Sequence, residues 1–347
     1  MAIENEINLP VKKYTDSAVF EEESKLLFEQ HWWLIGTTSS VDQKGKYISA
    51  RLGTATLFVL CNEQGELKGF HNICRHRAGP IVVDEQGTCP GKLLICQYHG
   101  WSYDFSGKLV NAHGLTQSID PAKTQLKKVR VETWNQMVFV TLGDAAPSLL
   151  HWLGTVAERV ETFLQSQNLT AQGVIKKNAH TNWKCYGDNA CEGYHVGLVH
   201  KTLGQSASNE KIDLHCEPEG EYVYFDVTYE DSQKDQSRTG KGLWIYKFPG
   251  LLIHCSKYGM NAECVLPQSE KQINITRWFW NNQDALEADS IEVTDLIDSA
   301  SDVMDEDIQI CEQVFTNLES GYAEPGPLSK VNEPGTIFFQ KLVSTTV

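Results

Sequence analysis

The chain has 347 residues, a formal net charge of −15 and a hydrophobic content of 41%. This length is sufficient for two domains, each with its own core. The acidic balance argues against nucleic acid and anionic membranes as partners. No apolar run approaches the length of about 18 residues that spans a membrane, and the start, MAIENEINLP, lacks the basic and apolar parts of a secretory signal. We therefore expect a cytoplasmic protein.

The N-terminal part of the chain has the pattern of a helix. Thr15 or Asp16 can cap it, and the apolar residues that follow recur at helical spacing up to Trp33. We therefore predict a helix over residues 15–35. Residues 1–44 are expected to form a helical segment that packs on the C-terminal domain.

In residues 45–146 the sequence pattern becomes that of short strands, separated by turn residues such as Gln64-Gly65 and Ser106-Gly107. This pattern predicts a small all-β domain. The expected strands cover residues 47–51, 56–61, 68–71, 93–97, 101–104, 125–132 and 137–142.

Two short motifs in this segment each combine a cysteine with a histidine. Cys74 and His76 form the first pair, Cys96 and His99 form the second, and 19 residues rich in turn formers separate them. Two thiolates and two imidazoles can hold a tetrahedral zinc or a [2Fe–2S] centre in which two histidines replace two cysteines on one iron. Zinc sites usually pair Cys with Cys and His with His, so the mixed pairs favour the iron–sulfur centre. The long separation predicts only an extended turn near residues 84–91.

The charge is unevenly distributed along the chain. Residues 45–150 hold 11 basic and 8 acidic residues, whereas the whole chain is strongly acidic. A locally basic domain can steer an acidic redox partner towards the metal. Alternatively, Lys123, Lys127, Lys128 and Arg130 only keep the edge of a strand soluble.

Ala146-Pro147 marks the boundary of a second domain, residues 147–347. Its first element is expected to be an amphipathic helix over residues 149–164, and further helices are expected near residues 185–200 and 285–320. Long strands are expected at residues 222–229, 242–248, 251–256, 263–267 and 272–280. Strands followed by long helices predict an α+β domain with a largely antiparallel sheet.

A second candidate metal site lies in this domain. His195 and His200 are five residues apart, which is roughly 140° on an ideal helix, so a local opening at Gly197 is needed for them to share a metal. Glu192 lies three residues before His195 and can contact it. The alternative is that both histidines are packed core residues.

Asp307 adds a carboxylate to this candidate site. It falls within the apolar stripe of residues 304–318, where a carboxylate is costly unless it is paired or binds a metal. The alternative is an aspartate that accepts a hydrogen bond from a buried partner. Two histidines and one aspartate would form the facial triad that suits non-haem Fe(II) with open positions for oxygen.

The motifs H-N-I-C-R-H-R-A-G-P and C-Q-Y-H-G-W-S-Y-D-F-S-G, with N-W-K…D-N…E-G-Y-H-x4-H and E-D-I-Q-I-C-E-Q, resemble the Rieske non-haem iron oxygenases over nearly the whole chain. The resemblance implies an all-β Rieske domain and a helix-grip (START-like) α+β catalytic domain. It implies Cys74 and Cys96 as ligands of one cluster iron and His76 and His99 as ligands of the other. It also implies His195, His200 and Asp307 as ligands of a mononuclear iron.

The same resemblance implies partners for electron transfer. In the family a carboxylate, commonly Asp, links the mononuclear iron to a Rieske histidine of the neighbouring subunit of a head-to-tail homotrimer. Here this position is Glu192, the histidine would be His99, and Asn189 would help to orient the iron ligands. No G-x-G-x-x-G motif is evident, so a separate flavin or iron–sulfur reductase is expected to deliver electrons from NAD(P)H, with O₂ as co-substrate.

The catalytic motifs are most similar to choline monooxygenase, glycine-betaine demethylase and carnitine monooxygenase types. They imply hydroxylation of a small quaternary amine, with or without N-demethylation. Aromatic residues are expected to form a cage for the ammonium group, the candidates being Trp244, Tyr246, Phe248, Trp278 and Trp280. The alternatives are a ring-hydroxylating dioxygenase or aryl O-demethylase of the same family, and a Rieske electron-transfer protein without turnover.

Overall fold

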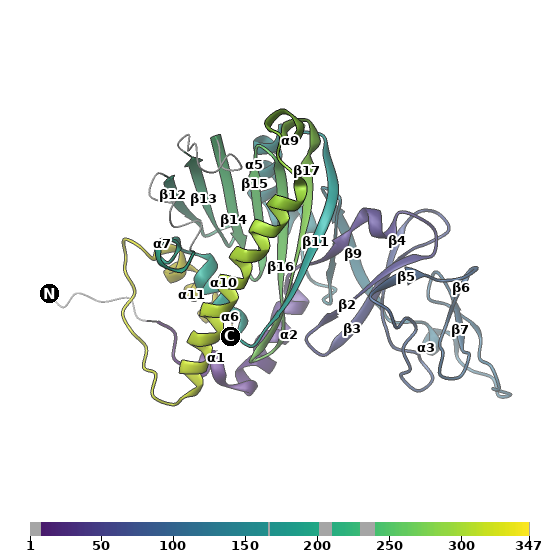
Figure 1. Cartoon of the computed structure of the whole chain (residues 1–347). Coiled ribbons are helices and arrows are strands. Elements are labelled where there is room, and N and C mark those ends of the chain that lie inside the picture. The colour runs from purple at the N-terminus through teal and green to yellow at the C-terminus, as the bar shows by residue number, and fades with distance from the viewer. Residues whose placement is uncertain (1–7, 166, 201–209, 230–239, 347) are drawn as a thin grey trace. The chain divides into compact units, whose positions relative to one another are not determined.

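The computed structural model describes residues 8–165, 167–200, 210–229 and 240–346 (Figure 1). The chain divides into two compact units. Residues 28–152 form the first, which we call the β unit. The described residues on both sides of it, before Phe28 and after Trp152, form the second, which we call the α+β unit. Of residues 1–44, which were expected to pack on the C-terminal domain, residues 8–27 lie in this second unit and residues 28–44 belong to the β unit, while residues 1–7 lie outside the described part.

The β unit begins at Phe28 and not at residue 45, where the all-β domain was predicted to begin. The reason is that the predicted N-terminal helix ends earlier than expected. Helices α1 (Lys12–Thr15) and α2 (Ser17–Gln30) are followed by strand β1 (Trp33–Thr37), in which every residue is buried. Strand β1 pairs with a strand from the end of the β unit. A continuous apolar run does not distinguish a buried strand from a helix, which explains the error.

The β unit contains two antiparallel sheets. The seven-stranded sheet has the order β1-β10-β9-β4-β3-β2-β5 and the small sheet has the order β6-β7-β8. Strand β5 lies where the sequence predicted only a long turn, and it pairs with β2 at the sheet edge. The elements after β1 are η1 (Thr38–Val41), β2 (Lys46–Leu52), β3 (Ala55–Cys61), β4 (Leu67–His71), β5 (Gln86–Thr88), β6 (Leu93–Ile95), β7 (Ser102–Asp104), β8 (Leu109–Asn111), α3 (Pro121–Thr124), β9 (Lys128–Trp134) and β10 (Met137–Thr141).

The α+β unit is built on one antiparallel seven-stranded sheet, with the order β11-β17-β16-β15-β14-β13-β12. The long helix α10 runs alongside this sheet (Figure 1). The arrangement confirms the predicted α+β class and antiparallel sheet. The strands are β11 (Leu169–Ala179), β12 (Glu210–Glu217), β13 (Tyr222–Tyr229), β14 (Gly240–Lys247), β15 (Leu251–Ser256), β16 (Gly259–Ser269) and β17 (Gln272–Asn282). The helices from residue 149 onwards are α4 (Leu149–Leu153), α5 (Thr155–Leu164), α6 (Trp183–Ala190), α7 (Val196–Val199), α9 (Gln283–Asp289), α10 (Val293–Glu319) and α11 (Pro334–Thr346).

The predicted helix over residues 149–164 is two helices. Gly154 stands between α4 and α5 with a φ of 53°, a left-handed value that glycine adopts without steric cost. Among the described residues, no helix combines the length and the apolar character needed to cross a bilayer.

A buried polar network holds α1, α6 and α11 together. The hydroxyl of Tyr14 donates to Asp188 Oδ2 at 2.7 Å, and Gln340 Nε2 donates to Asp188 Oδ1 at 2.9 Å. Burial raises the pKa of Asp188 to about 7, although both hydrogen bonds act in the opposite direction. The network therefore fixes the N-terminal and C-terminal helices to the helix that leads into the candidate metal site.

This raised pKa predicts a pH-dependent stability. An aspartate in an unfolded chain has a pKa of about 3.9, so between pH 4 and 7 the folded protein binds more protons than the unfolded chain, and its stability falls as the pH rises. The Asp188→Asn variant lacks this titration. Between pH 5 and 8 we expect the parent to lose roughly 2–3 kcal/mol of unfolding free energy relative to Asp188→Asn. Urea unfolding at each pH measures the difference, and a difference that stays constant with pH contradicts the prediction.

Candidate active site and metal centres

The four cysteine and histidine residues of the β unit lie on two neighbouring turns. Cys74 and His76 follow β4, whereas Cys96 and His99 lie between β6 and β7. Both cysteines are buried, with exposed fractions of 3% and 2%, while His76 is exposed and His99 is half-buried. The two imidazole rings are 4.7 Å apart between their centroids.

Tight backbone turns position the two thiols. The backbone N–H of Cys74 donates to Gly79 O at 2.8 Å, and the N–H of Gly100 donates to Cys96 O at 2.9 Å. Gly100 has a φ of 74°, which favours glycine. At Gly79, a side-chain Cβ would lie only 3.0 Å from the sulfur of Cys96. A larger residue at position 79 would therefore crowd the space beside the thiol.

The surroundings of Cys96 favour a metal-bound thiolate. Burial raises the pKa of Cys96, and Cys74 beside it adds to this effect. Backbone N–H groups of Tyr98 and His99 donate to its sulfur and lower the pKa, as donors to a thiolate do. Bound cations compensate such a buried pair of thiolates.

The imidazole ring of His76 is also held in place. The ring of Trp101 stacks on His76 at 4.8 Å with an interplanar angle of 7°. Among the described residues, these four side chains do not form a group whose donor atoms all lie within 4.8 Å, as donors around a single zinc ion would. Buried sulfurs and more exposed imidazoles fit a two-iron cluster in which the two cysteines would hold one iron and the two histidines the other.

The second candidate site lies in the α+β unit, where the helix over residues 185–200 is interrupted. Helix α6 ends at Ala190, and the next helix, α7, is a single turn. His195 occupies its N-cap position and His200 its C-cap position, where the backbone is extended. The two histidines therefore flank a single helical turn, and the extended backbone at His200 departs from the ideal helix on which the 140° separation was calculated. The predicted opening at Gly197 is not found, because Gly197 lies inside α7.

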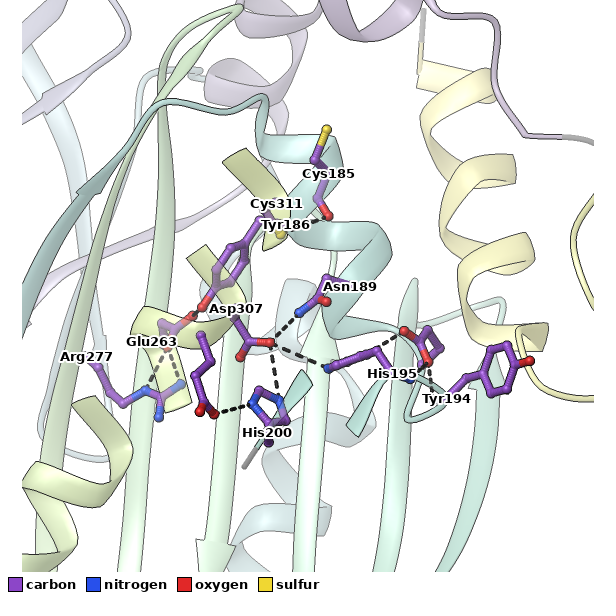
Figure 2. A network of polar contacts seen from close by, with 12 residues as sticks. Cys185, Tyr186, Asn189, Tyr194, His195, His200, Glu263, Arg277, Asp307 and Cys311 are labelled. Carbon is purple, nitrogen blue, oxygen red and sulfur yellow. Dashed lines mark hydrogen bonds and ion pairs between the residues drawn. The ribbon is translucent and has the colours of Figure 1, made fainter. Parts of the chain in front are cut away.

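The two histidines meet Asp307, which projects from α10 (Figure 2). The distance from Asp307 Oδ1 is 3.5 Å to His195 Nε2 and 3.4 Å to His200 Nε2. One donor atom from each residue lies within 4.8 Å of the other two. The structure thus brings together three predicted ligands from two segments that are far apart in the sequence. His200 and Glu306, the residue before Asp307, are 106 residues apart.

Each of the three side chains has a polar partner that orients it. Glu192 Oε1 lies 2.5 Å from His195 Nδ1, and Glu306 Oε2 lies 3.0 Å from His200 Nδ1. Asn189 Nδ2 donates to Asp307 Oδ1 at 2.7 Å. Because a carboxylate binds Nδ1 of each histidine, Nε2 of each is left to face Asp307. Such carboxylate–histidine pairs are typical around protein-bound metals.

Sequence reasoning missed Glu306. It lies next to Asp307 on α10 but about 100° around the helix, so helical periodicity places it outside the apolar stripe that contains Asp307. Helix α7 packs beside α10, which places the ring of His200 within reach of this second carboxylate. The sequence contained one signal, namely the run of acidic residues Asp305-Glu306-Asp307.

The charges of the site also suit a divalent cation. Burial lowers the pKa of His195, but Asp307 and Glu192 together raise it to about 9. The two histidines hold the pKa of Asp307 well below its ordinary value despite its burial. Protons therefore occupy the imidazoles when no metal is bound, and a cation would replace them. Two histidines and one carboxylate, each oriented by a partner, fit the facial triad of non-haem Fe(II).

The role of Glu306 can be tested by Glu306→Gln. Loss of a carboxylate that orients a ligand typically weakens metal affinity 10- to 100-fold, and we expect a decrease of that size in Fe(II) affinity. Glu312→Gln is the matched control, because Glu312 is on the same helix but accepts from the backbone N–H of His180. Anaerobic titration against a competing chelator measures both affinities. Equal Fe(II) affinities in the two variants would show that Glu306 does not support His200.

A cavity of about 230 Å³ adjoins the triad. Of the five aromatic residues proposed for a cage, only Trp244 lines it. Trp278 and Trp280 alternate along β17 with Arg277 and Phe279, which line the cavity, so both tryptophans point to the opposite face of the sheet. Tyr246 and Phe248 instead pack against Phe339 of α11, at 5.5 and 6.1 Å between ring centroids. The aromatic residues of the cavity that the sequence missed are Tyr186, Phe225, Tyr258 and Phe279.

Asn189 and Glu192 also line a second cavity, of about 290 Å³. This cavity is bordered by α1, by the beginning of α11 and by the segment before it. Glu192 therefore contacts His195 on one side and has access to a separate opening on the other.

Comparison with known protein families gives two matches. Residues 31–133 match the Rieske [2Fe-2S] domain, and residues 167–347 match the ring hydroxylating alpha subunit (catalytic domain). The first match falls within the β unit, and the second falls within the α+β unit.

Similar proteins cover almost the whole chain. A glycine betaine monooxygenase oxygenase subunit of Pseudomonas aeruginosa is 24% identical, over 97% of this chain and 88% of its own length. A choline monooxygenase of Beta vulgaris is 26% identical, over 91% of this chain and 72% of its own length. The crystal structure of a quaternary ammonium Rieske monooxygenase has the same fold, with a TM-score of 0.86 at 22% identity, over 98% of this chain and 95% of that one. The chain therefore belongs to the Rieske non-haem iron oxygenases as their oxygenase (alpha) component, an oxidoreductase with a Rieske [2Fe–2S] domain and a catalytic mononuclear iron domain.

Proposed function

We propose that this oxygenase component uses O₂ and electrons from a NAD(P)H-dependent reductase to hydroxylate a small quaternary amine, with N-demethylation as the outcome where a methyl group is oxidised. The observation that carries the proposal is the compact group of His195, His200 and Asp307 beside an aromatic cavity. The Rieske motif on the same chain adds a store for the second electron that O₂ activation requires.

The roles of the metal-binding residues are part of this proposal. Cys74 and Cys96 would hold one cluster iron, and His76 and His99 the other. His195, His200 and Asp307 would hold the mononuclear iron through two Nε2 atoms and one carboxylate. When bound, this iron activates O₂ and the cluster supplies an electron to it.

The neighbouring residues keep the ligands in position. Asn189 donates a hydrogen bond to Asp307 and so fixes the orientation of its carboxylate. Glu192 and Glu306 hold the two imidazoles by Nδ1, which selects the tautomer with a free Nε2 lone pair. The aromatic and aliphatic side chains of the cavity would reduce the contact of water with a bound methyl group.

Electrons would enter the site from another subunit. We propose a head-to-tail homotrimer in which His99 of the partner subunit approaches Glu192 through the second cavity. Support comes from the position of Glu192, which lines both cavities while it contacts His195. A separate flavin or iron–sulfur reductase would reduce the cluster, and the basic residues of the β unit would favour an acidic partner.

The proposed substrate class comes from the relatives and from the cavity. The relatives are named for glycine betaine and choline, and the structural neighbour for carnitine oxidation. Phe225, Trp244 and Phe279 line the cavity, and aromatic rings of this kind attract a trimethylammonium group.

The test is substrate-stimulated consumption of NADH and O₂ by the full-length protein with a surrogate reductase. Choline, glycine betaine and carnitine are compared with benzoate and an aryl methyl ether. Stimulation by a quaternary amine together with formaldehyde release supports N-demethylation, whereas stimulation without formaldehyde supports hydroxylation alone. Stimulation only by the aromatic compounds assigns the protein to ring hydroxylation or aryl O-demethylation. No stimulation by any of them, with a cluster that still accepts electrons, contradicts an oxygenase acting on these substrates.

A further inference from the structure

The face of the sheet that lines the substrate cavity is arranged in cross-strand rows. Consecutive register partners place one row across five strands, and every member lines the cavity. The members of this row, which we call the aromatic row, are Phe225, Trp244, His254, Asn261 and Phe279. The ring centroids of Phe225 and Trp244 lie 6.3 Å apart, and those of Trp244 and His254 lie 5.5 Å apart.

The row on one side of the aromatic row belongs to the metal end of the cavity. It contains Arg277, which lies two residues from Phe279 on β17 and lines the cavity. Arg277 Nε donates to Glu263 Oε2 at 2.7 Å, and Tyr186 donates to the other oxygen of Glu263 at 2.8 Å. The positive charge at this end is therefore already paired with a buried carboxylate.

The row on the other side is polar and has small side chains. It contains Ser256, Gly259 and Asn281, which are register partners on β15, β16 and β17. Leu296 and Ser299 from the start of α10 close the same end, whereas Asp307 lies further along that helix. The cavity therefore runs from the metal triad, past the aromatic row, to a polar end.

Asn281 has an unusual environment at this polar end. Its side chain is 4% exposed, and its Nδ2 has no hydrogen-bond partner among the described residues. A buried amide donor without a partner is costly, by about 1–3 kcal/mol, and in this orientation the Nδ2 atom is covered by the protein and does not open onto the cavity. Half a turn of the amide about χ2 exchanges its nitrogen and oxygen in almost the same space, so the amide can present N–H to a ligand.

We propose that Asn281 recognises the carboxylate of a zwitterionic substrate whose trimethylammonium group lies on the aromatic row. This inference rests on the proposed quaternary-amine function and narrows it to betaines. Adjacent rows on one face of the sheet are two residues apart along β17, which is about 7 Å. With bonds of about 1.5 Å, the nitrogen and a carboxylate oxygen are roughly 6 Å apart across three carbons and roughly 4 Å apart across one. The spacing of the rows therefore selects a three-carbon spacer.

The experiment measures binding to the full-length, iron-loaded protein by anaerobic isothermal titration calorimetry. The three probes are γ-trimethylammoniobutyrate, glycine betaine and butyltrimethylammonium, which carries the cation without the carboxylate. For Asn281→Leu we expect the Kd of γ-trimethylammoniobutyrate to rise about 10- to 100-fold, because a hydrogen bond to a charged group is lost. The Kd of butyltrimethylammonium should change less than about twofold. Asn274→Leu is the matched control, since Asn274 lies on the same strand and faces the other side of the sheet.

A second variant separates recognition from misfolding. Asn281→Asp places a negative charge opposite the carboxylate, so it should weaken binding of γ-trimethylammoniobutyrate and not that of butyltrimethylammonium. A loss of affinity for only one of the two ligands cannot come from a damaged fold. The inference is overturned if both Asn281 variants bind γ-trimethylammoniobutyrate within twofold of the parent, or if glycine betaine binds as tightly as the longer probe. If the parent turns over quaternary amines but Asn281 has no effect, only this inference fails; if the parent binds none of them, the proposed function fails with it.

Discussion

Replacing Asp307 by alanine should abolish turnover while leaving the Rieske cluster intact. Asp307 Oδ1 lies 3.4–3.5 Å from both histidine Nε2 atoms and supplies the only carboxylate donor of the described triad. Removal of a partner that merely orients a ligand costs 10- to 100-fold in affinity, so loss of a ligand itself should reduce Fe(II) affinity more than about 100-fold. Fe(II) titration and substrate-dependent O₂ uptake measure the two effects.

Asp305→Ala is the control for this variant. Asp305 lies two residues earlier on α10, is exposed, and pairs with Lys177 at 2.8 Å. Such a surface ion pair contributes at most about 1 kcal/mol, so the control should keep both its iron and its activity. An unchanged visible spectrum in Asp307→Ala shows that the β unit still holds its cluster. Full turnover by Asp307→Ala would remove Asp307 from the set of ligands.

Cys96→Ser should have a comparably large effect through the other metal site. Cys96 is 2% exposed, and burial raises the pKa of its thiol, while backbone N–H groups of Tyr98 and His99 donate to its sulfur, so a bound cation is needed to stabilise the thiolate. A serine hydroxyl is smaller and is not ionised at neutral pH, so we expect the cluster and its colour to be lost. NADH-dependent turnover should fall to background, while about one iron per chain remains at the triad.

Cys89→Ser provides the comparison. Cys89 is a half-buried thiol of the same unit that packs against the same hydrophobic cluster as Cys96 without belonging to the predicted ligand set. This variant should keep its colour and its turnover. If Cys96→Ser retained the cluster spectrum, the assignment of the four cluster ligands would be wrong.

The sequence predicted the parts of this protein that depend on local patterns. Strands β13 and β15 were predicted with the bounds that the structure shows, because alternating or compact apolar runs were flanked by turn residues. The candidate metal ligands could be proposed because their chemistry is rare and their spacing is informative. Asp307 was found because a carboxylate within an apolar stripe is costly.

The features that depend on tertiary packing were not predictable in this way. The buried run at residues 33–37 is a strand only because it pairs with β10. Glu306 reaches His200 because α7 lies beside α10, and no helical periodicity contains that contact. Which aromatic side chains line the cavity depends on which face of each strand is turned towards α10. Phe279 therefore lines the cavity, whereas Trp278 and Trp280 do not.

One measurement tests most directly whether two metal sites of different kinds share this chain. The full-length protein is reconstituted anaerobically with iron and sulfide, analysed for metal and sulfide, and examined by electron paramagnetic resonance after reduction. The account predicts about three irons and about two sulfides per chain, with the rhombic, low-g signal of a histidine-ligated [2Fe–2S] cluster. A protein that binds zinc, holds no sulfide and gives no such signal would contradict it.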